Sequence, residues 1–441
     1  MAEQMMQDRV NEKVAKQTVP AGYKQTEVGI IPEDWDVVSV SSLISSIGSG
    51  VSVNSVDKLN AFSHGMHVLK TSCVSEGGFL PDEKKSILPD DIHRAKCSPA
   101  KGDIIVSRMN TPLLVGELGY VPVDIEDSFL PDRLWLMKFK NSENVDSRWL
   151  SRLLSSSAFA KKIKESATGT SGSMKNISKD TFLAILVPKP VFKEQEAIAT
   201  SLADTDALIV GLEQLIAKKQ AIKTATMQQL LTGRTRLPQF ALRPDGTPKG
   251  YKSSELGQIP EDWKVATLGS LAHIKTGSKN NQDKVDNGQF PFFVRSEKVE
   301  WMNTFSYDCE AILIPGEGGI GSIFHYVNGK FEAHQRVYVI RDFSGVYGKF
   351  LHLWMRQYFG AHAMENSVKA TVDSLRLPTF QEFLVALPAI GEQTAIATIL
   401  SDMDSELTAL EQKLTKARAL KQGMMQQLLT GRIRLPLPQE A

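Results

Sequence analysis

Two stretches of this sequence have residue types and spacings that could do chemistry. Residues 316–321, Gly-Glu-Gly-Gly-Ile-Gly, have the glycine spacing of a dinucleotide-binding loop, but the Ser-Ile-Phe-His-Tyr-Val that follows is typical of a strand, where that loop requires a helix. Glu83 and the two lysines after it have the carboxylate–lysine spacing of many nucleases, without an upstream carboxylate placed to complete a metal site. The sequence also lacks a phosphate-binding Gly-Lys-Thr/Ser loop, an Asn-Pro-Pro-aromatic methyltransferase motif and a histidine cluster. We therefore expect no catalytic site, metal site or bound cofactor in this chain.

A third pattern suits contact with DNA. Arginine, lysine, asparagine, serine and threonine gather on loops next to expected strands, at 107–111 and 169–178 in the first half of the chain and at 295–298 and 369–373 in the second. Such side chains can contact phosphates and the edges of bases. The candidate DNA-binding residues are Arg108, Asn110, Thr111, Ser171, Ser173, Lys175, Asn176, Arg295, Lys298, Lys369, Thr371 and Asp373. The alternative for each of them is a solvated turn.

These loops belong to two stretches, 36–192 and 264–391, that are rich in expected strands. The runs at 103–107, 134–139 and 182–188 in the first stretch match those at 311–315, 337–340 and 383–388 in the second, and all have the composition of buried strands. Short helical segments are expected between them, at 147–165 and 348–359. The sequence thus predicts two mixed α+β domains that share strands and differ in their loops.

The two domains are set in a frame that occurs twice. The stretch Tyr-Lys-Gln-Thr-Glu-Val-Gly-Ile-Ile-Pro-Glu-Asp-Trp at 23–35 recurs with few changes at 251–263, and residues 194–234 recur at 392–432. Between these repeats the two copies differ in length and share little sequence. Trp35 and Trp263, which end the two copies of this stretch, are expected to be packing anchors rather than ligand contacts. A repeated frame with unlike contents suits a protein that holds two different recognition surfaces.

Two long helices are expected at 194–231 and 392–429. Neither stretch contains a proline, and apolar residues recur along both, in the second copy at the alternating steps of four and three that are typical of a coiled-coil seam. Gly233 and Gly431 are placed to end the helices in a left-handed conformation. The apolar positions are Ile198, Leu202, Ile209, Leu212, Ile216 and Ile222 in the first copy and Ile396, Leu400, Met403, Leu407, Leu410, Leu414 and Ala417, with Leu420 just beyond, in the second.

The charges on these helices predict how they pair. In each helix, acidic residues lie in the first half and basic residues lie in the second. A parallel pair would place like charges together along its length, whereas an antiparallel pair places each acidic half against a basic half. We therefore predict an antiparallel two-helix coiled coil that relates the two copies by a pseudo-two-fold axis. The alternative is that each helix only covers the sheet of its own domain.

A two-helix seam leaves much of each helix uncovered, so partner subunits are expected to bind along this pair. The candidate residues for the spacer and for partner docking are Ile198, Leu202, Ile209, Leu212, Ile396, Leu400, Leu407 and Leu410.

The composition is that of an ordinary globular protein. The chain has 441 residues, of which 42% are hydrophobic and 23% are charged, enough for roughly two to four domains. It has no apolar run long enough to cross a membrane, no secretory signal at its start and three cysteines without paired spacing, so we expect a cytoplasmic protein. Its formal net charge is +1, so a basic surface for nucleic acid would have to be local.

Several of these motifs together resemble the specificity subunit of type I restriction-modification systems. They are the paired Gly-x-Ile-Pro-x-x-Trp motifs at 29–35 and 257–263, the Glu-Gln helix starts, and the Gln-Gln-Leu-Leu-Thr-Gly-Arg helix ends. The resemblance covers the whole chain except an N-terminal extension. The organisation that it implies is an extension at 1–22, target-recognition domains at 23–192 and 237–391, spacer helices at 193–236 and 392–435, and a tail at 436–441.

The resemblance also implies partners. The subunit of this family is not an enzyme: it binds double-stranded DNA and two copies of an adenine-N6 methyltransferase subunit that uses S-adenosylmethionine. The complex then recruits restriction subunits, which use ATP and Mg²⁺. Methylation of this kind requires the target adenine to leave the base stack, so the recognition domains must tolerate or promote base flipping by the partner.

On this interpretation each domain reads one half of a bipartite DNA target. Because the domains differ, the halves should be unlike, with unread base pairs between them and half-site centres about one helical turn apart. Lengthening both helices by whole turns should widen the gap and leave each half unchanged. Two alternatives stay open: a protein–protein scaffold without DNA recognition, and a self-sufficient DNA-modifying enzyme, which the missing motifs disfavour.

Overall fold

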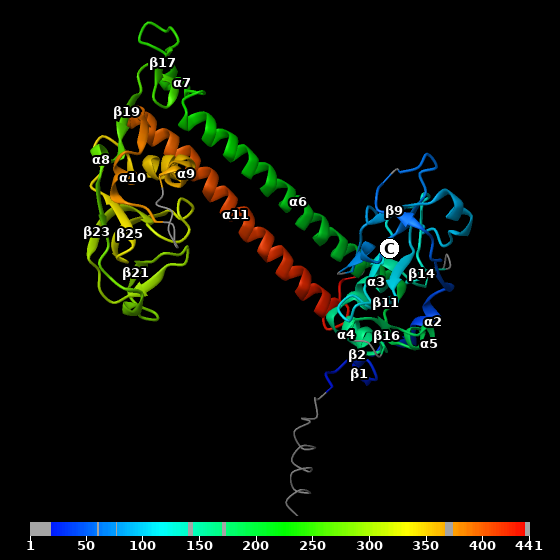
Figure 1. The fold of residues 1–441 in the computed structure, drawn as a ribbon. Coiled ribbons are helices and arrows are strands. Elements are labelled where there is room, and N and C mark those ends of the chain that lie inside the picture. Colours follow the sequence, from blue (N-terminus) through cyan, green and yellow to red (C-terminus); the bar gives the residue numbers. More distant parts are fainter. Residues whose placement is uncertain are drawn as a thin grey trace, which may run out of the picture. The chain divides into compact units, whose positions relative to one another are not determined.

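The computed structural model describes residues 19–59, 61–75, 77–139, 144–169, 173–366 and 374–436. The chain forms two compact units (Figure 1). The first unit combines Met1–Gly211 with Leu414–Ala441, and the second is Leu212–Lys413. Each unit contains one expected recognition domain and part of each long helix. The boundaries between the units therefore lie within the two segments expected to be spacer helices.

The first unit consists of short strands and helices followed by part of a long helix. Its elements are β1 (Tyr23–Thr26), β2 (Gly29–Pro32), β3 (Asp36–Ser39), α2 (Val40–Leu43), β4 (Ser46–Ser49), β5 (Ser55–Val56), β6 (His67–Leu69), η1 (Thr71–Cys73), β7 (Val74–Ser75), β8 (Gly78–Phe79), β9 (Lys84–Ile87), η2 (Pro89–Arg94), β10 (Ile104–Ser107), β11 (Met109–Asn110), β12 (Leu118–Tyr120), β13 (Ser128–Phe129), β14 (Leu134–Lys138), α3 (Ser147–Ser155), α4 (Ser157–Glu165), β15 (Lys175–Asn176), α5 (Lys179–Leu183), β16 (Leu186–Lys189), the first half of α6 (Phe192–Leu231) and the last part of α11 (Ile390–Leu428).

Two four-stranded sheets form the centre of the first unit. Their strand orders are β12-β10-β14-β4 and β13-β6-β9-β5; the pair β13·β6 is parallel and the other pairs are antiparallel. Strand β10 is apolar without alternation because both of its faces are covered. Ile104 and Val106 face a core that includes Trp149 of α3. Ile105 faces a second core with Leu136.

The second unit has fewer and longer strands. Its elements are the second half of α6, α7 (Pro238–Ala241), β17 (Tyr251–Ser254), β18 (Gly257–Pro260), β19 (Lys264–Thr267), α8 (Leu268–Leu271), β20 (His273–Thr276), η3 (Asn281–Asp283), β21 (Phe290–Phe293), β22 (Glu300–Met302), β23 (Tyr307–Pro315), β24 (His325–Ala333), β25 (Val337–Arg341), α9 (Gly348–Glu365), α10 (Leu377–Gln381), β26 (Leu384–Leu387) and the first part of α11 (Ile390–Leu428).

A six-stranded sheet with the order β20-β25-β23-β24-β21-β22 forms the centre of the second unit. Ile312 and Ile314 of β23 face a core with Phe350 of α9. Leu313, between them, faces the opposite core with Phe331. The arrangement β4·β14·β10 in the first unit has the same connectivity as β20·β25·β23 in the second. The predicted fold class, two mixed α+β domains in tandem, is confirmed.

One predicted strand is shorter than the sequence suggested. The run at 182–188 begins in helix α5, and only its second part joins strand β16. The helix forms because the Ser178 hydroxyl accepts a hydrogen bond from the Thr181 N–H (3.1 Å) and so caps its first turn. Phe182 then points inward, fully buried, with its ring 5.7 Å from that of Trp135.

The two long helices pack antiparallel in both units, as their charges predicted (Figure 1). In the second unit Lys219 lies 2.7 Å from Glu406, and Lys223 pairs with Asp404. In the first unit Lys421 lies 2.5 Å from Asp206. Each unit thus joins the acidic half of one helix to the basic half of the other.

The seam follows a slightly different line from the apolar positions in the sequence. Ile222 and Leu420, expected on it or next to it, are 42% and 58% exposed. The steps of four and three continue instead to Lys223 and Lys421. A lysine stem can cover apolar surface while its charged end reaches a carboxylate at the edge, which explains why both lysines are tolerated there.

Both helices end as predicted at a glycine in the left-handed conformation, with φ of +68° at Gly233 and +69° at Gly431. A side chain at either position would also collide with the frame. A Cβ on Gly233 would lie 2.5 Å from Pro260, and one on Gly431 would lie 2.5 Å from Pro32. The repeated glycine is therefore needed both for its conformation and for the close approach of the hairpin.

Charge reversal in the seam tests this pairing. We expect Lys223→Asp and Asp404→Lys each to destabilise the second unit, and the double variant to regain most of the loss. The coupling energy should be about 1 kcal/mol, at the upper end for such pairs because Lys223 is only 9% exposed. Urea unfolding of the four proteins measures it, with Lys218→Asp on the exposed face as control. A coupling energy of zero would show that this pair does not help to set the register.

Candidate nucleic-acid interface

The two loops predicted in the first unit come together. Strand β11 lies within one of them and pairs antiparallel with β15, which lies within the other, so that Asn110 is opposite Lys175. The Ile177 N–H also donates to the Arg108 carbonyl at 2.9 Å. The structure therefore joins into one surface two segments that lie far apart in the sequence.

Two of the candidate side chains on the first loop hold its shape. The Arg108 Nε–H donates to the carbonyl of Asp132 at 2.7 Å, and the side-chain amide of Asn110 donates to the Ser107 hydroxyl at 3.2 Å. The Asn110 amide oxygen accepts a hydrogen bond from the Thr111 N–H at 2.9 Å, while the Thr111 side chain is exposed. The first two residues thus stabilise the turn, and Thr111 stands at its surface.

The second loop contains further candidates in different settings. Lys175 Nζ donates to the Gly169 carbonyl at 3.1 Å. The Asn176 side-chain oxygen is buried without a hydrogen-bond partner within the part of the chain that the structure describes. Ser173 is exposed, and Ser171 lies outside the described residues.

In the second unit the loop at 295–298 occupies a different place in the fold from the loop at 107–111. The segment equivalent to 107–111 is the one after β23, because Glu317 there bridges Ser374 as β11 pairs with β15. Arg295 and Lys298 follow β21 instead, a strand that a single sequence does not identify as the neighbour of β24. Lys369, Thr371 and Asp373 lie outside the described residues. The glycine-rich run at 316–321 leads into strand β24, as expected, and not into a helix.

Arg295 and Lys298 nevertheless belong to a basic cluster, which consists of Lys284, Arg295, Lys298 and Arg336. Glu317 lies 3.4 Å from Arg295 and 3.3 Å from Arg336. Glu300 lies 3.4 Å from Lys284 and 3.5 Å from Lys298. Four exposed cations share two carboxylates whose side chains are only 18% and 23% exposed, although Asp283, Asp286 and Glu297 lie beside them in the sequence. The cluster therefore offers exposed cationic donors rather than a strongly basic surface.

Sequence reasoning missed Lys284 and Arg336 in this cluster. Lys284 follows the short helix η3, and Arg336 lies in the turn before β25. Neither position belongs to a repeat or a periodic pattern, and only the pairing of β21 with β24 brings them near Arg295. No signal in a single sequence could have found them.

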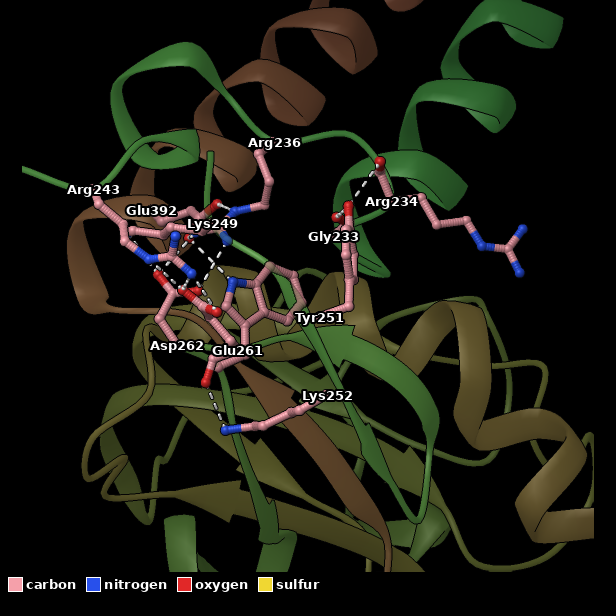
Figure 2. A network of polar contacts seen from close by, with 11 residues as sticks. Gly233, Arg234, Arg236, Arg243, Lys249, Tyr251, Lys252, Glu261, Asp262 and Glu392 are labelled. Atoms are coloured by element: carbon pink, nitrogen blue, oxygen red, sulfur yellow. Dashed lines mark hydrogen bonds and ion pairs between the residues drawn. The ribbon is translucent and has the colours of Figure 1, made fainter. Parts of the chain in front are cut away.

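A buried ionic clamp fixes the helix ends to the frame of the second unit (Figure 2). Glu392 is 2% exposed and accepts hydrogen bonds from Trp263 Nε1 (3.2 Å) and from Arg236 Nε (2.6 Å). Arg236 also forms two hydrogen bonds with Asp262, at 2.9 and 3.1 Å, and its guanidinium lies 5.7 Å from the centre of the Trp263 ring. Lys249 donates to the same aspartate at 2.8 Å.

The charge partners of Asp262 hold it ionised. Burial alone would raise the pKa of this carboxyl, but hydrogen bonds from Arg236 and Lys249 outweigh it and lower the pKa to about 2. Asp262 is therefore ionised at any pH at which a cell operates. Next to it, the Tyr251 hydroxyl donates to the carbonyl of Gly233 at 3.0 Å and ties the hairpin to the helix end.

The first unit contains the same clamp, formed by the two ends of the chain. Glu194 is 1% exposed and accepts hydrogen bonds from Trp35 Nε1 (3.0 Å) and from Arg434 Nη2 (2.7 Å). Arg434 also makes two hydrogen bonds of 2.9 Å with Asp34. Here the Tyr23 hydroxyl donates to the carbonyl of Gly431 at 3.0 Å.

Both tryptophans of these clamps are fully buried, which confirms their prediction as packing anchors. The two arginines were not predicted, although the sequence contains a signal for them. The repeat continues past Thr-Gly-Arg as Thr-Arg-Leu-Pro in one copy and Ile-Arg-Leu-Pro in the other, so an arginine recurs at the same place. Arg236 and Arg434 therefore belong to the frame, and the basic cluster belongs to the variable part.

The candidate docking residues lie mostly inside the chain. Ile198 and Leu202 belong to the core of the first unit, and Ile396 and Leu400 belong to that of the second. Leu407 and Leu410 are also buried, and Ile209 and Leu212 are partly buried along the seam. A seam residue cannot present its side chain to another subunit because its own partner helix covers it. The large apolar residues exposed on α6 are Leu208, Val210, Leu215 and Ile222.

Within the described residues, no group of three or more histidine, cysteine, aspartate or glutamate side chains could hold a metal ion. Among the helices of the described segments, none is both long and apolar enough to cross a membrane.

Comparison with known proteins shows one family. The family model for the type I restriction modification DNA specificity domain matches residues 32–224 and 260–417. The specificity subunit of the type I restriction enzyme EcoDI from Escherichia coli is 33% identical over 181 residues, which are 40% of this chain and 40% of that protein. The specificity subunit of the type I restriction enzyme MjaVIII from Methanocaldococcus jannaschii is 23% identical over 437 residues, 92% of this chain and 94% of that protein.

A solved structure shows the same fold. The S subunit of a type I restriction-modification system from M. genitalium superposes with a TM-score of 0.57 at 17% sequence identity. The match covers 89% of this chain and 96% of that one. The similarity therefore extends over both units and includes the long helices.

Proposed function

This chain belongs to the type I restriction modification DNA specificity family, and we propose that it selects the DNA target of a methylating and restricting complex by reading one half of that target with each unit. The observation that supports this most directly is the contrast between frame and contents. The ionic clamp, the hairpin and the helix ends occur in both units with the same contacts. The surface loops, in contrast, differ between the two units. A repeated frame that carries unlike loops serves two unlike half-sites.

We propose that the partners supply the chemistry. A methyltransferase subunit that carries S-adenosylmethionine would act on an adenine in each half-site, and restriction subunits would use ATP and Mg²⁺. Two copies of the methyltransferase subunit would bind along the outer faces of the long helices, because their seam faces are already buried. The complex would act in the cytoplasm, on the DNA of the host and on DNA that enters the cell.

The basic cluster of the second unit supports direct contact with DNA. Protein–DNA contacts go largely to phosphates through exposed cationic side chains, and the cluster places four of these together in a chain that is close to neutral. A protein–protein scaffold would have no need for it. No observation favours a self-sufficient enzyme.

The test is a genome-wide map of N6-methyladenine in the native host with this chain present and deleted. We expect deletion to remove one asymmetric, gapped motif, and deletion of the partner methyltransferase to remove the same motif as a control. An unchanged map, in cells shown to express that methyltransferase, would reject target selection in favour of the scaffold.

A further inference from the structure

Each unit contains a polar cavity at the same place in its fold. In the second unit the cavity has a volume of about 390 Å³ and lies where the chain leaves β21, beside Arg295 and Ser296. In the first unit the cavity has a volume of about 400 Å³ and lies where the chain leaves β6, beside Lys70 and Thr71. Strands β6 and β21 occupy corresponding places in the two units. Strand β6 pairs in parallel with β13, which precedes β14, and β21 pairs in parallel with the end of β24, which precedes β25.

The opposite walls of the two cavities also correspond. In the first unit the wall is the turn after β4, where the Val51 N–H donates to the Leu130 carbonyl at 3.2 Å. In the second unit the Ser278 N–H after β20 donates to the Ala333 carbonyl at the same distance, and the chain then reaches Asn281, which lines the cavity. The residue after that carbonyl lines the cavity in each case, Pro131 in one and His334 in the other. Strands that the two domains share therefore enclose one cavity in each unit, and different side chains line it.

The cavity of the second unit presents hydrogen-bond donors. The Arg336 N–H donates to His334 Nδ1 at 3.0 Å, so the neutral ring carries its proton on Nε2 and can only donate there. Burial first, and then the nearby Arg295 and Arg336, lower the pKa of this histidine and keep it neutral. Arg295 adds the N–H groups of its guanidinium.

Arg295 is positioned and still available. Its side chain is 52% exposed, and a single nitrogen reaches Glu317 at the long distance of 3.4 Å. The other oxygen of that carboxylate lies 3.3 Å from Arg336, so two arginines share one negative charge. Most of the guanidinium fork is thus free to bind a second group. A rigid fork of donors matches the N7 and O6 acceptors of guanine in the major groove.

We propose that the two equivalent cavities are base-reading pockets, and that the pocket of the second unit selects a guanine through Arg295, which Glu317 positions. This inference rests on the proposed function and adds to it the residues that determine the sequence of one half-site. In the first unit Lys70 takes the corresponding place and lies 2.9 Å from Asp57, which also faces Lys85 at 3.9 Å. The side chains that line the two pockets differ, and so the pockets read different bases.

The test uses the complex of this chain with its methyltransferase partner and the target found in the methylation map. Each guanine of the target is replaced in turn by 7-deazaguanine, which lacks the N7 acceptor. For the unaltered complex, one replacement in the half-site of the second unit should weaken binding about 5- to 150-fold. Arg295→Ala should weaken binding to the normal target by a similar factor and should be insensitive to that replacement.

Three variants make the outcome specific. Arg295→Lys keeps the charge and can still donate to N7 or O6, but without the rigid fork its response to the replacement should be smaller than that of the unaltered complex. Arg243→Ala removes another half-exposed arginine of the same unit. Arg243 lies 2.7 Å from Glu261 and does not line the cavity, so this variant should behave as the unaltered complex. Lys70→Ala should alter preference in the other half-site only. Thermal melting of each variant shows that it is folded.

Two results would overturn the inference while leaving the proposed function intact. One is that folded Arg295→Ala responds to every 7-deazaguanine replacement as the unaltered complex does. The other is that Arg295→Ala and Lys70→Ala change the same half-site. If the methylation motif itself persists without this chain, it is the proposed function that fails.

Discussion

Replacement of Arg236 by alanine is expected to lower the free energy of unfolding of the second unit by about 3–5 kcal/mol, because it leaves the buried Glu392 without its cation. The arginine side chain is 8% exposed and the glutamate side chain 2% exposed. Water in the space left by the arginine would be a weaker partner for the carboxylate, to which the Trp263 Nε1–H still donates. Removing one partner from a buried pair is far more destabilising than the net contribution of the intact pair.

The molecule provides two comparisons for this variant. Arg243→Ala breaks an ion pair with Glu261 whose arginine is 42% exposed, and it should change stability by less than about 1 kcal/mol. Arg434→Ala in the first unit should have an intermediate effect, since its side chain is 36% exposed although Glu194 is as buried as its counterpart. The expected order of destabilisation is Arg236, then Arg434, then Arg243.

Hydrogen exchange measures each unit separately. Amides of the pair β19·β26 report on the second unit and those of β3·β16 on the first. Arg236→Ala should lower protection in the first of these pairs much more than Arg243→Ala does. If the two variants lowered it equally, the clamp would be an ordinary surface network, and the frame would be held by its apolar core alone.

The parts of the structure that the sequence predicted are those governed by local patterns. The long helices follow from apolar spacing and the absence of proline, and their antiparallel pairing follows from the charges on each half. Gly233 and Gly431 recur at positions that require a left-handed backbone. Each of these features depends on residues close together in the chain or on an exact repeat.

The candidate site was predicted less well because its geometry is long-range. The pairing of β11 with β15 brings together the two loops chosen from composition in the first unit, and their contact with DNA stays a prediction. In the second unit the chosen Arg295 loop follows β21, and its relation to Glu317 depends on a sheet order that no local pattern encodes. The seam lysine Lys223 was missed because a charged residue at a core position breaks the rule that identifies the seam.

Burial along helix α6 leads to a second large effect. Leu202→Ala should lower the free energy of unfolding of the first unit by about 2–5 kcal/mol, because the side chain is fully buried in a core that includes Leu428 and Leu429 of the other long helix. The lost atoms are not replaced by solvent, and the helices and the sheet meet at this point, so the cavity cannot close easily. Urea unfolding of the isolated chain measures the change.

Leu208→Ala is the matched control, with the same substitution in the same helix and the same unit. Its side chain is 54% exposed, so the stability of the isolated chain should change by less than about 0.5 kcal/mol. Leu202 was also a candidate for contact with partner subunits, and a residue reserved for a partner would destabilise only the complex. A loss of stability for Leu202→Ala in the isolated chain, with none for Leu208→Ala, therefore assigns the inner face of the helix to the fold and leaves the outer face for partners. The reverse order would place the seam on the other side of the helix and contradict the antiparallel pairing.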